Sequence, residues 1–243
     1  MNLALEGLNA GYGKLNVLRD LSLSFAAGQF TAILGPNGSG KSTLLRSIFG
    51  LANVFSGSIT VDGNPITGLT GAEIVSLGLA CVPQRNNVFD ELNVGENLQL
   101  ATRQMDRRER ARALEAAGDL FPLVAKRRDQ PASLLSGGER QMLAIAMGWL
   151  SRPTLMLLDE PSAGLAPNLV NDVFHTLLQL KGQGMTLVVV EQNARSVLRH
   201  CDQVFILREG KLAFAGSAEA CLRDEESIKS LLGAGNTGQT LPA

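Results

Sequence analysis

This sequence has few cysteines and almost no net charge. Its 243 residues include three cysteines, Cys81, Cys201 and Cys221, which fall in no metal-binding or redox spacing. We therefore expect reduced, mostly buried thiols of a cytosolic protein rather than disulfides or a metal site. The formal net charge is −1, which gives no reason to expect a general attraction to nucleic acid.

Long hydrophobic runs are absent as well. No apolar stretch approaches the roughly 18 residues that a membrane-spanning helix needs. The N-terminus, Met-Asn-Leu-Ala-Leu-Glu, lacks the basic region and apolar run of a signal peptide. Any link to a membrane is therefore expected to run through a partner. Hydrophobic residues nevertheless make up 45% of the chain, which predicts a substantial core and one domain, with or without a subdomain.

Hydrophobic patterns divide the chain into strands and helices. Leu21, Leu23 and Phe25 alternate with polar or small residues, which predicts β structure in the first 30 residues. Further strands are predicted at 30–34, 57–63, 78–83, 155–158 and 186–190, with a hairpin of 204–207 and 211–214 around Glu209-Gly210. Helices are predicted at 42–49, 97–121, 136–150 and 167–180. The fold class is therefore α/β, with a β-rich edge, a parallel core and an all-helical insertion.

The helical insertion, about residues 85–150, contains an arginine-rich segment. Its arginines are Arg103, Arg107, Arg108, Arg110 and Arg112. We interpret this segment as a solvated helix face. Beyond residue 232 the chain is small and polar, so residues 233–243 are expected to form a flexible tail.

The segment Gly35-Pro-Asn-Gly-Ser-Gly-Lys-Ser42 lies between a predicted strand and a predicted helix. This is the context required of a phosphate-binding P-loop. Its glycines allow backbone N–H groups to face phosphate oxygens, and the helix start adds a positive dipole end. Lys41 is expected to reach the β- and γ-phosphates of ATP, and Ser42 to offer its hydroxyl to Mg²⁺.

The segment Leu155-Met-Leu-Leu-Asp159-Glu160 is a buried strand that ends in two carboxylates. Many strands end in acids, but this one follows a P-loop by about 120 residues. The pairing assigns Asp159 to the coordination of Mg²⁺ and Glu160 to the polarisation of the attacking water.

The segment Leu135-Ser-Gly-Gly-Glu139 also begins a predicted helix. Ser136 and Glu139 have the spacing of a capping box, which is a purely structural reading. That reading leaves two glycines in a first helical turn unexplained, where glycine costs roughly 1 kcal/mol relative to alanine. Bare amides facing an anion would explain them, and a well-capped helix N-terminus is compatible with a phosphate site.

Together these motifs resemble the ATP-binding-cassette (ABC) ATPases, and the resemblance covers roughly residues 1–232 as a single domain. It implies a P-loop NTPase core (1–84 and 151–232), an antiparallel β subdomain and the helical insertion. It also implies that Tyr12 stacks on adenine and that Gln84 touches Mg²⁺ or the water and senses the transport partner. The family pairs head to tail, so Ser136–Gly138 would contact ATP on another subunit. The resemblance implies three sets of site residues. The implied catalytic residues are Glu160, Gln192, Gln84 and Lys41, and the implied Mg²⁺ ligands are Ser42, Gln84 and Asp159. The implied nucleotide-binding residues are Tyr12, Gly35, Pro36, Asn37, Gly38, Ser39, Gly40, Lys41, Ser42, Thr43, Leu135, Ser136, Gly137, Gly138 and Glu139.

The chain departs from the family pattern at three positions. Gln192 stands where a histidine usually contacts the γ-phosphate; an amide donates a hydrogen bond but carries no positive charge. Ala166 replaces an aspartate in the loop that crosses the dimer, and Met147 replaces an arginine after the Leu-Ser-Gly-Gly sequence. These are either harmless substitutions or signs of a heterodimer with two unequal ATP sites. We favour the heterodimer.

The sequences around 82–89, 162–167 and 191–194 resemble the second ATPase subunit of branched-chain amino acid importers. Relatives in that branch that serve urea and short amides remain an alternative, as does a weakly hydrolysing regulatory ABC ATPase outside transport. A DNA-repair ATPase needs a long coiled-coil insertion, and the 95 residues from Lys41 to Ser136 leave no room for one. The resemblance implies ATP and Mg²⁺ as cofactors, and a second ATPase subunit, membrane permeases and indirectly a solute-binding protein as partners. It places the chain in the cytoplasm, on the inner face of the membrane.

Overall fold

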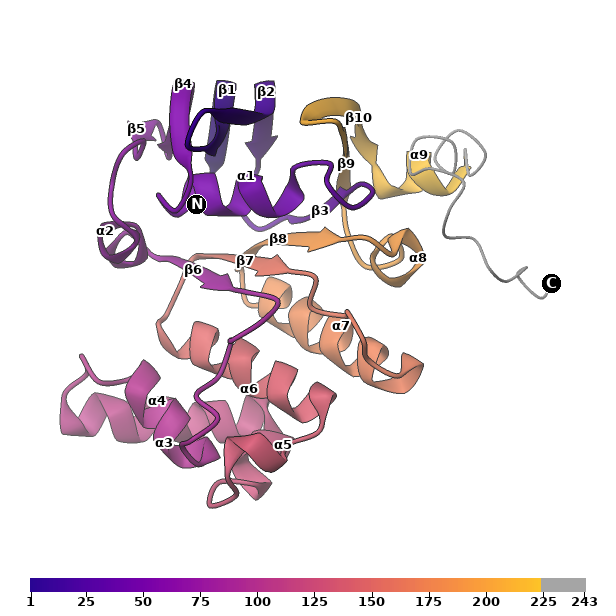
Figure 1. Cartoon of the computed structure of the whole chain (residues 1–243). Helices are drawn as coiled ribbons and strands as arrows, with labels where there is room; N and C mark the ends of the chain where they lie inside the picture. The colour runs from indigo at the N-terminus through magenta and orange to yellow at the C-terminus, as the bar shows by residue number, and fades with distance from the viewer. Residues whose placement is uncertain (224–243) are drawn as a thin grey trace.

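Two β-sheets form the framework of the protein. The computed structural model describes residues 1–223, so the predicted tail at 233–243 lies outside the described residues. The first sheet is antiparallel and four-stranded, in the order β2-β1-β4-β5. Its strands are β1 (Leu3–Tyr12), β2 (Leu15–Phe25), β4 (Asn53–Val61) and β5 (Asn64–Pro65). This sheet is the predicted β-rich edge, and it lies at the top of Figure 1.

The second sheet is six-stranded, in the order β10-β9-β3-β8-β7-β6. Five strands are parallel, and only β10 is antiparallel, to β9. The strands are β3 (Phe30–Leu34), β6 (Leu79–Val82), β7 (Leu155–Asp159), β8 (Thr186–Glu191), β9 (Gln203–Arg208) and β10 (Lys211–Ser217). The strands predicted in this half of the protein are thus confirmed, including the hairpin around Glu209-Gly210, where both residues have positive φ.

Both faces of the five parallel strands are buried, which explains why these strands are mostly apolar, whereas β10 at the edge is largely exposed. On β8, Val188 and Val190 join a core shared with the antiparallel sheet and α1 (Lys41–Ile48). Leu187 and Val189 join a second core on the opposite face. That core is covered by α6 (Gly137–Leu150) and α7 (Pro167–Gly182), so Figure 1 shows α1 above the sheet and α6 and α7 below it.

Between β6 and β7 every element is helical, as predicted. The helices are α3 (Val94–Ala101), α4 (Arg107–Leu120), α5 (Pro122–Lys126), the short 3-10 helix η1 (Ala132–Leu134) and α6. The remaining helices are α2 (Gly71–Ser76), α8 (Ala194–Val197) and α9 (Ala218–Arg223). No helix within residues 1–223 combines the length and the apolar character needed to span a bilayer.

The prediction of one helix over 97–121 is wrong, because α3 ends at Ala101 and α4 starts at Arg107. Asp106 caps α4, since its Oδ1 accepts from the backbone N–H groups of Arg108 and Glu109, both at 2.8 Å. Arg110 reaches back and donates to the Thr102 carbonyl at 3.3 Å. Local capping therefore stabilises a turn that the helical periodicity does not reveal.

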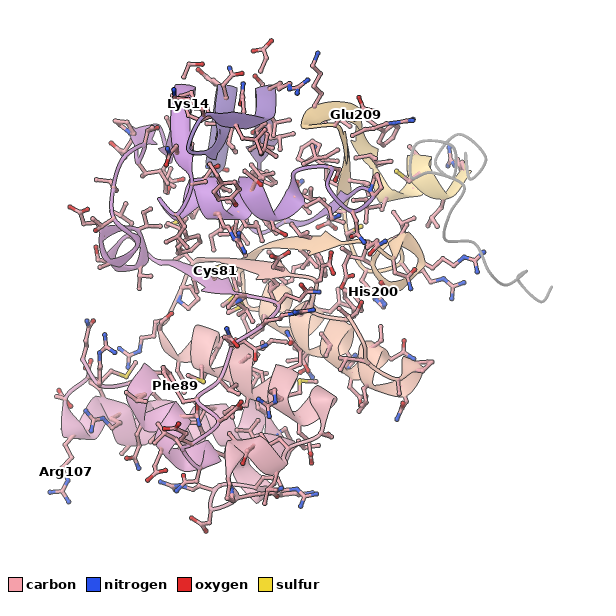
Figure 2. The ribbon with its side chains drawn as sticks, in the orientation of Figure 1. Lys14, Cys81, Phe89, Arg107, His200 and Glu209 are labelled. Atoms are coloured by element: carbon pink, nitrogen blue, oxygen red, sulfur yellow. The ribbon has the colours of Figure 1, made fainter. Side chains whose placement is uncertain are left out.

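The arginine-rich segment is mostly solvent-exposed, as predicted. Figure 2 shows Arg107 at the outer edge of the helical region, pointing away from the protein. The three cysteines are free thiols, with Cys221 buried and the other two half-buried. Burial raises the pKa of Cys81 and Cys201 to about 12, which keeps these thiols protonated and unreactive.

Candidate ATP site

The P-loop joins β3 to α1, as the sequence predicts. Gly40 has a φ of 104°, and a Cβ there would lie 2.7 Å from Leu18 Cδ2, so this position requires glycine. Helix α1 starts without a side-chain cap and without an acidic residue in its first turn. Its N-terminal amides and dipole are therefore not neutralised by α1's own side chains, which suits an anion.

The side chain of Lys41 is folded back over the loop. It is 4% exposed, and its Nζ donates to the carbonyls of Gly35 at 2.7 Å and Pro36 at 3.1 Å. Burial lowers the pKa of Lys41, and the nearby carboxylates of Glu160 and Asp159 oppose that effect. The ammonium is thus held at the loop, where it is positioned to meet a phosphate.

Other P-loop residues are held by the β9–β10 hairpin. Ser39 is 2% exposed, and its carbonyl accepts from the N–H of Gly210 at 3.0 Å. Thr43 is also buried, at 7% exposed, whereas Asn37 and Gly38 are exposed at the tip of the loop. The loop therefore has a fixed base and an open tip.

Ser42 and Asp159 meet at the carboxyl end of β7. The Ser42 hydroxyl donates to Asp159 Oδ1 at 3.3 Å. Burial raises the pKa of Asp159, against the hydrogen bond from Ser42 and the positive charges of Arg46 and Lys41. Two oxygen donors side by side suit Mg²⁺, which takes few protein ligands and completes its shell with water and phosphate oxygens. Residues 1–223 contain no cluster of three or more His, Cys, Asp or Glu that could hold a metal ion.

Glu160 and Gln84 also meet at this edge. Gln84 Nε2 donates to Glu160 Oε2 at 2.8 Å, and so joins the end of β6 to the end of β7. Glu160 has a φ of 47°, a left-handed conformation that is uncommon for a residue with a side chain. Such strain is concentrated at functional sites.

Tyr12 lies at the end of β1 and is 37% exposed. Arg46 Nη1 donates to its hydroxyl at 3.2 Å, and the guanidinium lies 6.0 Å from the ring centroid. The ring is thus held by a cation on α1 and leaves surface free for stacking. The sequence motifs do not single out Arg46, because only the fold brings α1 beneath β1.

The Leu135–Glu139 motif begins α6, and the predicted capping box is present. Ser136 Oγ accepts from Glu139 N–H at 3.4 Å, and Glu139 Oε2 accepts from Ser136 N–H at 2.9 Å. Gly138 has a packing role that its sequence context does not show, because a Cβ would lie 2.8 Å from Leu169 Cδ1. Gly137 is exposed, whereas Leu135 is only 9% exposed and packs in the core.

The three departures from the family pattern lie on different elements. Gln192 is half-buried directly after β8. Ala166 is the N-cap residue of α7, which has no side-chain cap hydrogen bond. Met147 on α6 is half-buried against the core. The residue before Gln192, Glu191, is only 2% exposed and was not among the predicted site residues.

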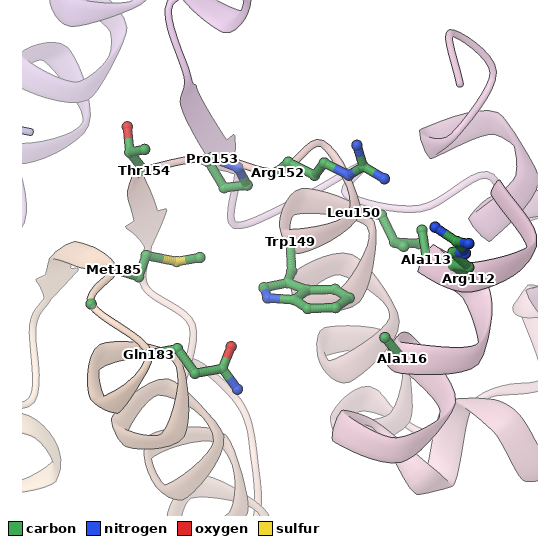
Figure 3. A pocket seen from close by; sticks show the side chains of 11 residues that line it. Arg112, Ala113, Ala116, Trp149, Leu150, Arg152, Pro153, Thr154, Gln183 and Met185 are labelled. Carbon is green, nitrogen blue, oxygen red and sulfur yellow. The ribbon is translucent and has the colours of Figure 1, made fainter. Parts of the chain in front are cut away.

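A cavity of about 460 Å³ lies away from these residues (Figure 3). It opens between α4 and the C-terminal ends of α6 and α7, and none of the predicted site residues lines it. Thr154 and Met185 in its wall precede β7 and β8, so it lies at the amino ends of those strands. Ligands of open α/β sheets bind at the carboxyl ends, which is where Lys41, Asp159 and Glu160 gather.

Comparison with known proteins identifies the family to which this chain belongs. Residues 18–163 match the ABC transporter family. The chain is 41% identical to the probable branched-chain amino acid transport ATP-binding protein LivF of Archaeoglobus fulgidus, over 93% of this chain and 96% of that protein. It is 36% identical to the high-affinity branched-chain amino acid transport ATP-binding protein BraG of Pseudomonas aeruginosa, over 95% of this chain and 99% of that protein.

Solved structures of ATP-binding cassettes have the same fold as this chain. The ADP conformation of an ATP-binding cassette of an ABC transporter superposes with a TM-score of 0.86 at 27% identity, covering 95% of this chain and 97% of that one. A dimeric cassette in a post-hydrolysis state bound to ADP and Pi gives 0.79 at 25% identity, covering 89% and 98%. The chain therefore belongs to the ABC transporter family, as one of the ATPases whose hydrolysis of ATP is coupled to transport.

Proposed function

We propose that this chain is the ATP-hydrolysing subunit of an importer for branched-chain amino acids. Two relatives named for branched-chain amino acid transport, 41% and 36% identical over nearly the whole chain, support this solute class. In this proposal the chain works with permease subunits, a solute-binding protein and a second ATPase subunit. It lies on the cytoplasmic face of the membrane through its contact with the permeases.

One observation carries the proposed chemistry: five polar side chains meet where β3, β6 and β7 end. Lys41 binds the β- and γ-phosphates, while Ser42 and Asp159 are the residues that would hold Mg²⁺. When bound, Mg²⁺ neutralises phosphate charge. Glu160 orients and polarises the attacking water, and Gln84 holds the Glu160 carboxylate in place.

A second ATPase subunit is proposed because the two glycine motifs begin helices on opposite faces of the six-stranded sheet. Helix α1 packs on the face shared with the antiparallel sheet, and α6 packs on the other. Each ATP site would then combine one subunit's P-loop with the partner's Leu135–Glu139 segment.

The test is reconstitution of the transporter in proteoliposomes with its solute-binding protein. Leucine, isoleucine or valine is expected to drive uptake and to stimulate ATP hydrolysis. Urea, acetamide and glutamate serve as comparison solutes, and stimulation by one of them alone would refute the branched-chain assignment without touching the ATPase assignment. The Glu160→Gln variant is expected to lose most ATP turnover, whereas Glu115→Gln, an exposed change on α4, is expected to retain it.

We also propose that the two ATP sites of the assembled transporter are unequal. Gln192 cannot place a positive charge on a γ-phosphate, and Ala166 cannot supply a carboxylate to the facing subunit. Gln192→His is therefore expected to raise basal hydrolysis. Unchanged hydrolysis in that variant would contradict the view that Gln192 restrains turnover.

A further inference from the structure

Glu191 is a buried carboxylate that the proposed chemistry does not use. It ends β8 after five buried residues and is itself 2% exposed. Its Oε1 accepts from the backbone N–H of Ser162 at 3.0 Å. This contact satisfies a carboxylate that would otherwise be costly to bury, which indicates that the position of Glu191 is specifically stabilised.

The partner of Glu191 belongs to the loop that follows the proposed catalytic glutamate. We define this segment, residues 160–166, as the post-strand loop. It is fastened to β8 at two points: Glu160 N–H donates to the Val190 carbonyl at 2.9 Å, and Ser162 N–H donates to Glu191. Between these points lies the left-handed backbone of Glu160, with φ 47°. A sparsely populated conformation persists only where the surroundings hold it.

We propose that Glu191 is a positioning residue for ATP hydrolysis, whose carboxylate fixes the post-strand loop and thereby the backbone of Glu160. Glu191 also precedes Gln192 directly, so one side chain ties the Glu160 loop to the residue expected at the γ-phosphate. The inference rests on the proposed role of Glu160, because a loop position matters for turnover only if Glu160 takes part in it.

Two substitutions of Glu191 distinguish the effect of its side-chain length from the effect of its charge. Glu191→Gln keeps the length of the side chain and an oxygen that accepts from Ser162, but removes the charge. Glu191→Asp keeps the charge and shortens the side chain by about one carbon–carbon bond, which lengthens a 3.0 Å contact beyond hydrogen-bonding distance. A positioning role predicts that glutamine substitutes better than aspartate, and a role for the charge predicts the reverse.

The experiment measures kcat and KM for ATP in the assembled transporter, and hydrogen exchange of the post-strand loop. Glu191→Gln is expected to stay within about threefold of the unaltered kcat and to keep the loop protected. Glu191→Asp is expected to lower kcat about tenfold or more, because misplacing a reacting group by about 1 Å can cost a hundredfold. Its KM for ATP is expected to change by less than threefold, since aspartate keeps the negative charge that acts on Lys41. Its loop is expected to exchange faster.

An active Glu191→Asp with a protected loop would overturn the proposal, as would a Glu191→Gln as inactive as Glu160→Gln. If the aspartate variant does not fold, the glutamine variant decides between these outcomes alone. Should Glu160→Gln retain full turnover, the proposed role of Glu160 fails by itself. Hydrogen exchange in the two Glu191 variants then still shows whether this side chain fixes the loop.

Discussion

The buried carboxyl of Glu191 makes the stability of the folded chain depend on pH. Burial raises its pKa from 4.5 to about 7, against the hydrogen bonds from Ser162. Between these two values the folded chain holds a proton that the unfolded chain releases, so this group lowers stability as pH rises from about 4.5 to 7. Because one pKa unit corresponds to about 1.4 kcal/mol, ionisation of Glu191 costs the folded state about 3 kcal/mol by pH 8.

Glu191→Gln removes the ionisation and with it this pH dependence. The variant is therefore expected to gain stability over the unaltered chain as pH rises, by about 3 kcal/mol between pH 4.5 and pH 8. For a chain of this size such a gain corresponds to about 6 to 12 °C in Tm. The gain is fully developed above pH 7 and absent below pH 4.5, since both proteins are then uncharged at this position.

The assay is thermal and urea unfolding of both proteins at several pH values from 4.5 to 8, without nucleotide or Mg²⁺. Leaving these ligands out matters because each brings charge to the neighbourhood of Glu191. Glu115→Gln, an exposed change on α4, serves as the control and is expected to shift stability by less than about 0.5 kcal/mol throughout. A difference between Glu191→Gln and the unaltered chain that stays constant across this range would refute the reasoning.

Three further changes test other parts of the structure. Ala166→Ser supplies the missing cap of α7 and is expected to raise the free energy of unfolding by about 1 kcal/mol in urea titrations, with Ala166→Gly as the comparison. Asn97→Ala removes a buried amide that binds the N–H and C=O of Phe89 at 2.8 and 3.0 Å. It is expected to cost about 3 kcal/mol in the same titrations, and a loss below 1 kcal/mol would count against these contacts. Arg46→Met releases the ring of Tyr12 and is expected to raise KM for ATP several-fold without lowering kcat in steady-state assays.

Sequence motifs identify the P-loop and the acidic strand because their chemistry restricts residue type as well as spacing. Gly40 has a backbone angle and a neighbour that exclude a side chain, and Asp159 must follow a buried strand to reach Ser42. Such constraints are local in the chain, or link motifs that are each recognisable alone. The strands of the parallel sheet are predictable for a related reason, since burial on both faces strongly favours apolar residues.

Contacts made by ordinary residues are harder to predict. Glu191 is one more acid at the end of an apolar strand, and nothing in its neighbours along the chain indicates that it faces Ser162. Arg46 is similarly a single basic residue on an amphipathic helix until the fold brings it to Tyr12. The break between α3 and α4 depends on Asp106, a strong cap in the midst of good helix formers. In each case the deciding partner is set by tertiary structure or by a competing local hydrogen bond.

Two of the three residues that depart from the family pattern, Ala166 and Gln192, lie close to the post-strand loop and its anchor on β8. Ala166 ends the post-strand loop at the N-cap position of α7, where it makes no side-chain cap hydrogen bond, while Gln192 follows the carboxylate that accepts from Ser162 in this loop. A change at Ala166 or Gln192 therefore lies next to a contact that joins this loop to β8, the hydrogen bond from Ser162 to Glu191. If Glu191 fixes the loop as proposed, the missing charge at Gln192 and the missing carboxylate at Ala166 are expected to change the contacts proposed with ATP and with the facing subunit, and to leave the position of Glu160 unchanged. The proposal of two unequal sites is therefore compatible with the proposal that Glu191 positions Glu160.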